Sequence, residues 1–296
     1  MDLKYASENG LNPQEVLLLM NDMKSVIRSG IPSKKCYKNL VFSCNKYGLH
    51  FLKGKFKEGS EEQVFYISKS KSLARDAYEA ERGGNKKELG RLLGYPECCI
   101  DFFVNDIRMR SQNDPRMRTH FHMERDNIPR IVSIFLNTKD KPCFYNNNIF
   151  NSASRPNIDE RLLKNKERLK RHNHFLIPHV PCSYTCKKSI KIGETVLELL
   201  EKKMPKFADE IVSSLKRIFI VFGEFEFVAI RGKVNKNEIT YGDPIIINLN
   251  QRDEKALKQG NRMVRDNDKI CIFKNETLLH TIKRRSEYHG VVMDFT

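Results

Sequence analysis

LGRLLGYPECC, residues 89–99, is the stretch that decides how this part of the chain folds. Asn85 upstream, with Glu88 three residues later, predicts a capped helix that runs into the stretch. Gly94-Tyr95-Pro96 predicts a tight turn, because glycine and proline both end helices and proline suits the first turn of a new one. The new helix has an apolar side made by Ile100, Phe103 and Ile107. The sequence therefore predicts two helices joined by one turn.

Cys98 and Cys99 lie at the start of the second of these helices. A helix N-terminus offers free amide donors and a partial positive charge, so it favours thiolates. Adjacent cysteines point in different directions on a helix, so one can ligate a metal while the other packs or reacts. This pair is the first half of a candidate site.

The second half is HVPCSYTC, residues 179–186, which follows an apolar run and precedes a predicted helix over 188–203. Cys182 and Cys186 are four residues apart, and His179 precedes them by three, so one metal ion could reach all three side chains. The predicted metal site therefore consists of Cys98, Cys99, His179, Cys182 and Cys186.

Four alternatives fit this set of residues. Any four of the five side chains satisfy tetrahedral zinc, and three or four cysteines hold an iron–sulfur cluster. A metal-free thiol nucleophile with His179 as its base, acting on a small acidic substrate, is a third reading. Structural cysteines that only pack are the fourth, since each pair alone is a weak signal.

Other parts of the N-terminal half predict a mixture of helices and strands. The apolar stripe from Val16 to Ile27 predicts a helix that begins at Asn12 and ends at Gly30. Strands are predicted over 40–42, 48–56 and 63–68, and a helix from Ser72 to the Gly83-Gly84 pair. Residues 108–158 are interpreted as polar and irregular, with a short apolar segment at 131–136.

The pattern changes after residue 216, where many short β-prone segments alternate with glycine turns. We predict an α+β fold: a mixed domain over 1–215 that holds the Cys/His cluster, and a small β-rich, barrel-like domain over 216–296. The strands of the second domain are predicted over 218–222, 226–231, 238–241, 245–249, 269–273, 278–282 and 290–293.

The charge balance indicates a polyanionic partner. The 296 residues include 53 Lys and Arg against 37 Asp and Glu, a formal net charge of +16. RNA is the first candidate partner, although a solvated surface explains the same composition. Phosphate contacts are expected from a basic helix over 159–173, through Arg161, Lys164, Arg168, Lys170 and Arg171.

The composition and the N-terminus predict a cytoplasmic protein with no membrane segment. No apolar run reaches the roughly 18 residues that a membrane span needs. The polar N-terminus, with Asp2, Lys4 and Glu8, does not have the pattern of a signal peptide. The eight cysteines are therefore expected to be reduced and available for metal binding or reaction.

The two motifs, residues 89–99 and 179–186, resemble those of a mostly archaeal family known as domain of unknown function 483. The resemblance covers roughly residues 50–200 and implies that Cys98, Cys99, His179, Cys182 and Cys186 form the family's site. It implies no activity. From these features we predict a zinc or iron–sulfur protein that binds or modifies RNA. The alternatives are a nucleic-acid-binding protein with a structural zinc site and the metal-free thiol enzyme.

Overall fold

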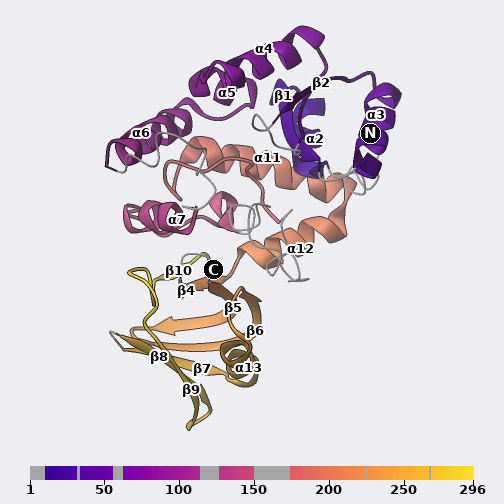
Figure 1. The fold of residues 1–296 in the computed structure, drawn as a ribbon. Helices are drawn as coiled ribbons and strands as arrows, with labels where there is room; N and C mark the ends of the chain where they lie inside the picture. The colour runs from indigo at the N-terminus through magenta and orange to yellow at the C-terminus, as the bar shows by residue number, and fades with distance from the viewer. Residues whose placement is uncertain are drawn as a thin grey trace. The chain divides into compact units, whose positions relative to one another are not determined.

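The computed structural model describes residues 11–31, 34–55, 63–113, 127–149, 174–223, 226–266 and 268–296. The chain divides into two compact units (Figure 1). The first comprises residues 1–118, 176–182 and 187–208, and the second comprises residues 119–175, 183–186 and 209–296. The predicted domain boundary between residues 215 and 216 stays a prediction.

The first unit contains a three-stranded antiparallel sheet in the order β1-β3-β2. Its strands are β1 (Val26–Ile31), β2 (His50–Lys55) and β3 (Gln63–Ser68). The central strand β3 is the most buried, because it has a neighbour on each edge and helices on each face.

Helices cover both faces of this sheet. On one face, α4 (Lys71–Arg82) and α5 (Lys86–Leu92) pack their Ala74, Ala77 and Leu92 side chains against Val26 and Tyr66. On the other face, α3 (Lys34–Lys46) contributes Tyr37, whose ring packs against Phe51 and Phe65. The unit is completed by α2 (Pro13–Met20), α6 (Glu97–Asn113) and α11 (Lys187–Lys203), and α2 contacts α11.

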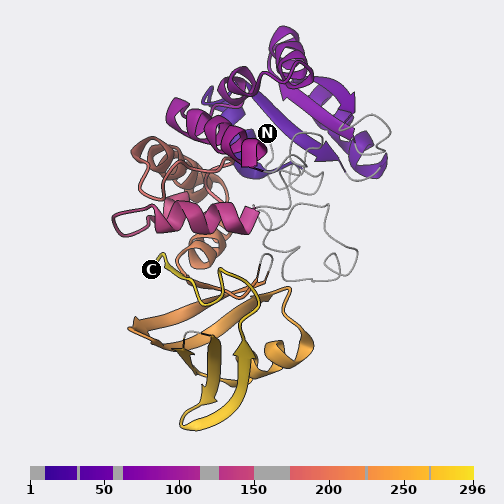
Figure 2. The same cartoon turned by 60° about the vertical axis from the view of Figure 1, so that its left-hand side comes forward.

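The second unit is built on a seven-stranded antiparallel sheet in the order β10-β4-β5-β6-β7-β8-β9 (Figure 2). Its strands are β4 (Ile218–Val221), β5 (Phe227–Asn235), β6 (Glu238–Ile247), β7 (Arg262–Asp266), β8 (Lys269–Lys274), β9 (Thr277–Lys283) and β10 (Val292–Asp294). Among the described residues β9 pairs only with β8 and β10 only with β4, so this sheet is open rather than a closed barrel.

One face of the large sheet is packed into an apolar core, and the other is partly open. Helix α13 (Gln251–Gln259) packs Leu257 into the apolar core on the first face, which also contains Val228 and Ile239. On the opposite face, Phe219 is covered by Phe295, but the far ends of β5 and β6 leave Lys233 and Thr240 exposed. The unit also contains α7 (Asn127–Leu136) and the 3-10 turn η3 (Phe144–Asn146), while α12 (Pro205–Leu215) spans residues of both units.

The mixed α+β prediction is confirmed, together with the helices around the cysteine motifs. Helices α4, α5 and α11 begin and end within a few residues of the predicted bounds, and α6 begins at the predicted turn but runs on to Asn113, through residues 108–113 that were expected to be irregular. The Asn85 cap is also confirmed, since its side chain accepts a hydrogen bond from the Glu88 backbone N–H at 3.1 Å.

Several predicted elements are wrong. The helix predicted from Asn12 to Gly30 ends at Met20, where Asp22 adopts a φ of 58°. The following Val26 and Ile27 enter β1, because β-branched residues favour a strand. Residues 40–42 belong to α3, whose short apolar run looks like a strand when read alone.

The other errors lie in segments predicted to be loops or separate strands. Residues 127–136 form α7, although they were expected to be irregular. Residues 238–247 form the single strand β6, because Gly242 still pairs with Arg231 of β5 and the ladder continues past an irregularity in which β6 has one residue more than β5. Helix α13 and strand β7 were not predicted.

Within the described residues, no helix is both long and apolar enough to cross a bilayer.

Candidate metal centre

The first two cysteines of the candidate centre are fixed by the start of α6. The Pro96 carbonyl accepts hydrogen bonds from the backbone N–H groups of Cys99 and Ile100, at 2.9 and 3.0 Å. This turn brings the sulfur atoms of Cys98 and Cys99 to 4.0 Å from each other. Cys99 is buried, whereas Cys98 is half-buried.

The glycines of the 89–99 stretch explain why the turn before these cysteines is so tight. Gly94 has a φ of +73°, and a Cβ atom there would lie 2.7 Å from the Met23 carbonyl oxygen. A Cβ atom at Gly90 would lie 2.9 Å from Ile100 Cγ1, so this glycine lets α5 and α6 pack closely. The two glycines therefore set the position from which α6 presents its cysteines.

The second pair of cysteines lies on one turn that leads into α11. The Cys186 backbone N–H donates to the Ser183 carbonyl at 3.1 Å, and α11 begins at the next residue. The Ser183 hydroxyl oxygen accepts from the Thr185 backbone N–H, also at 3.1 Å. Both hydrogen bonds keep the turn compact, so Cys182 and Cys186 project from neighbouring points.

A buried asparagine holds this turn from the side. The Asn146 Nδ2 atom lies within 3.2–3.3 Å of the carbonyl oxygens of Ser183, Tyr184 and Cys186. The Cys143 backbone N–H also donates to the Tyr184 carbonyl at 3.1 Å. Asn146 was missed by sequence reasoning, because its Asn-Asn-Asn run looked like an ordinary polar loop.

The structure brings together four of the predicted site residues. The sulfur atoms of Cys98, Cys99, Cys182 and Cys186 all lie within 4.8 Å of one another. Cys99 is the buried member of the set, with 2% of its surface exposed, and its sulfur accepts a hydrogen bond from the Cys182 backbone N–H at 3.4 Å. The arrangement can hold a metal ion.

His179, the fifth predicted residue, lies next to this sulfur group and contacts it through a serine. Its Nε2 atom is 2.8 Å from the Ser189 hydroxyl oxygen, which in turn is 3.3 Å from the Cys99 sulfur. The imidazole also packs against the Tyr95 ring, with 5.1 Å between centroids. Ser189 was not predicted; its place in the first turn of α11, three residues after Cys186, was the available signal.

The other predicted features lie elsewhere. The described side chains of Cys44, Cys143 and Cys271 are outside the sulfur group, and burial raises the pKa of the Cys44 thiol to about 11. The predicted phosphate-binding residues Arg161, Lys164, Arg168, Lys170 and Arg171 lie outside the described residues.

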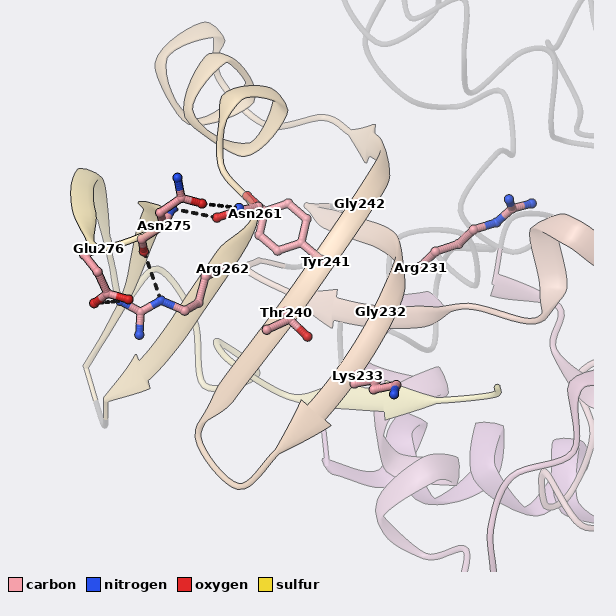
Figure 3. Close-up of a pocket in the computed structure, with 10 residues that line it drawn as sticks. All are labelled: Arg231, Gly232, Lys233, Thr240, Tyr241, Gly242, Asn261, Arg262, Asn275 and Glu276. Carbon is pink, nitrogen blue, oxygen red and sulfur yellow. Dashed lines mark hydrogen bonds and ion pairs between the residues drawn. The ribbon is translucent and has the colours of Figure 1, made fainter.

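A second feature is a hollow of about 730 Å³ on the large sheet of the second unit (Figure 3). Arg231 and Lys233 extend from β5 on one side of it, with Thr240 on β6 between them and Arg262. Arg262 forms ion pairs with Glu276 and Glu238 at 3.3 and 3.6 Å, so its charge is largely balanced. Among the described residues, no carboxylate lies within ion-pair distance of Lys233.

Comparison with known families adds one finding. Residues 71–212 match the model of a family described as a protein of unknown function (DUF483). This segment belongs to DUF483. The DUF483 segment contains all four clustered cysteines, His179 and Ser189, which agrees with the resemblance seen in the two motifs. No curated protein and no solved structure matches the chain.

Proposed function

We propose that Cys98, Cys99, Cys182 and Cys186 bind one zinc ion as thiolates. The observation that carries this proposal is the mutual distance of their sulfurs, all within 4.8 Å. A zinc–sulfur bond of about 2.3 Å places the four sulfurs of a tetrahedral site roughly 3.8 Å apart. Small side-chain movements therefore close the observed group around a single ion.

The same distances favour a single ion over an iron–sulfur cluster. In a cluster several iron atoms lie between the cysteine sulfurs, so the sulfurs must be spread more widely than around one ion. Here every pair of sulfurs is close, including those of the adjacent Cys98 and Cys99 at 4.0 Å.

The proposed site is structural in type. Four protein thiolates fill the tetrahedral positions of zinc and leave none for a substrate, which is the arrangement of structural zinc sites. The ion would link the start of α6 to the turn before α11, two segments far apart in the sequence. Its binding energy would then contribute to folding.

We also propose that the protein binds nucleic acid through the open face of its large sheet. The net charge of +16 supplies long-range attraction to phosphates. On that face Lys233 and Thr240 are cross-strand neighbours and both are exposed, beside the hollow that Arg231 and Arg262 also line. An open basic face, together with a metal site whose four positions are filled by thiolates, favours a nucleic-acid-binding protein with a structural zinc site over an RNA-modifying enzyme.

The test of the metal proposal is metal analysis and absorption spectroscopy on protein purified without oxygen. We expect one zinc per chain, no visible colour, and loss of the metal in Cys182→Ala. The matched control is Cys271→Ala, which removes a half-buried cysteine outside the group and should keep the zinc.

Two other outcomes would contradict the proposal. Iron with sulfide and a broad visible absorption band would show a cluster instead. The absence of any metal, with rapid alkylation of one of the four thiols at neutral pH, would favour the metal-free thiol enzyme.

A further inference from the structure

The environment of Cys99 differs from that of a cysteine that is only a ligand. Its sulfur is 3.3 Å from the Ser189 hydroxyl oxygen and 3.4 Å from the Cys182 backbone nitrogen. Ser189 is fully buried, and its hydroxyl also contacts His179 Nε2 at 2.8 Å. All of these groups belong to the first unit.

We propose that His179 and Ser189 are positioning residues that supply a fixed hydrogen-bond donor to the Cys99 thiolate. This inference rests on the proposed metal site, and it goes beyond that site by assigning roles to two residues that are not sulfur ligands. The roles follow from the number of protons available to each group.

A metal-bound thiolate has no proton and can only accept hydrogen bonds. The single hydroxyl proton of Ser189 is therefore directed to the Cys99 sulfur, and the hydroxyl oxygen is left as an acceptor. His179 then donates through Nε2–H, which fixes its tautomer. These hydrogen bonds form a relay in which His179 donates to Ser189 and Ser189 donates to Cys99.

This hydrogen-bond relay has two consequences for the metal site. A hydrogen bond to a sulfur withdraws electron density from it, so it tunes the bond between that sulfur and the metal. It also holds the Cys99 side chain in one orientation before the metal arrives, which lowers the cost of ordering the ligand. Both effects weaken if the hydroxyl is removed, and the Cys182 backbone N–H then still donates to the Cys99 sulfur.

The experiment loads the full chain with Co²⁺ as a spectroscopic probe of thiolate ligands. In Ser189→Ala we expect the sulfur-to-cobalt charge-transfer band to move to lower energy, since the sulfur becomes a better electron donor. We also expect Co²⁺ to be held about 10- to 100-fold more weakly against a competing chelator. The matched control is Ser43→Ala, because Ser43 is equally buried but its hydroxyl donates to the Asn39 carbonyl at 2.9 Å.

A second pair of variants tests the direction of the hydrogen-bond relay. It also covers the case in which Ser189→Ala fails to fold. His179→Gln keeps an N–H donor near Ser189 and should retain the wild-type band and affinity. His179→Ala removes the donor and should shift both in the same direction as Ser189→Ala.

The outcomes separate this inference from the proposed function. Wild-type protein that shows no thiolate-to-cobalt band would overturn both the proposed metal site and the roles of His179 and Ser189. Wild-type protein that binds Co²⁺, with bands and affinities unchanged in Ser189→Ala and His179→Ala, would leave the metal site standing and overturn the role of the two residues. Equal loss in His179→Gln and His179→Ala would likewise overturn it.

Discussion

Asn146 is the residue whose role in the centre is the most specific after the cysteines themselves. Its amide group faces the carbonyl oxygens of Ser183, Tyr184 and Cys186, all on the turn that carries the second cysteine pair. It is fully buried, so these carbonyl groups have their donor away from bulk water, where an unmade hydrogen bond costs the most. Asn146 therefore connects the stability of the second unit with the shape of the cysteine turn.

We expect Asn146→Ala to lower the free energy of unfolding by about 1–3 kcal/mol, because carbonyl groups of the turn lose their buried donor. It should also weaken zinc binding. Urea denaturation and a chelator competition measure the two effects. The control is Asn137→Ala, which removes an exposed amide that donates to the Ser133 carbonyl. Equal stability of the two variants would contradict this role.

Cys44 should be the least reactive thiol among the described cysteines. Burial raises its pKa to about 11, so at pH 8 only about one molecule in a thousand carries the reactive thiolate. In native protein stripped of metal, we expect iodoacetamide to modify the half-buried Cys98, Cys182 and Cys186 well before Cys44, as read by mass spectrometry of peptides. Early modification of Cys44 would show that this region opens in solution.

At the residue scale, the sequence predicted the sulfur group but not what surrounds it. The cysteines could be found because their spacing and their positions before helices are readable in one dimension. Ser189 and Asn146 carry no such signal, since serine and asparagine are common in helix starts and loops. The contact of Ser189 with Cys99 spans about 90 residues and that of Asn146 with Tyr184 spans about 40, so only the folded chain reveals them.

At the scale of elements, the turn between α5 and α6 depends on a position that only glycine can occupy without strain. Gly94 has a positive φ, and its Cα hydrogen faces the Met23 carbonyl and Lys24. Gly84 has a similar φ of +70° but nothing within 4 Å of the position of a Cβ atom. The two glycines allow backbone strain to be separated from steric overlap.

We expect Gly84→Ala to cost about 1–2 kcal/mol of stability, which is the cost of a left-handed conformation alone. Gly94→Ala should lower the stability clearly more than Gly84→Ala does. It should also weaken zinc binding, because Met23 and Lys24, just before β1, must move away from the turn that leads to Cys98. Thermal unfolding with and without zinc measures both. Identical losses of stability in Gly84→Ala and Gly94→Ala would contradict the expected steric overlap at residue 94.

The elements that the sequence predicted wrongly share a physical cause. The stripe from Val16 to Ile27 fits a helix in its apolar spacing, yet the chain turns at Asn21 and Asp22 and continues as a strand. The choice was made by β3, which offers Val26 and Ile27 a hydrogen-bonding partner some 40 residues away. Local patterns could not show this pairing, whereas the helices with clear caps near the cysteines depend on local signals and were found.

At the scale of the whole molecule, the surplus of positive charge should appear as salt-dependent binding. We expect a short RNA oligonucleotide to bind with an affinity that falls steeply as salt rises, because cations are released from its phosphates. Lys233→Glu should weaken binding several-fold and reduce the salt slope by about 1. Fluorescence anisotropy across a salt series measures both quantities.

The matched control is Lys258→Glu, which makes the same change of charge on α13. Lys258 forms an ion pair with Glu254 at 2.6 Å and lies on the helix that covers the other face of the sheet. If the two variants weaken RNA binding equally, the attraction comes from net charge alone and the open face is not the binding surface.

The distance in sequence between the two cysteine pairs also affects how the protein is made. A ribosome releases Cys98 and Cys99 long before Cys182, which follows Cys99 by 83 positions (182 − 99). At about 5–20 residues per second, the first pair waits several seconds for the second. During that time the early thiols can take up a metal only with foreign ligands. Once residue 186 has emerged, the proposed zinc ion would close a loop of about 80 residues in the folded chain, and its binding energy would offset the entropy lost in closing a loop of that length.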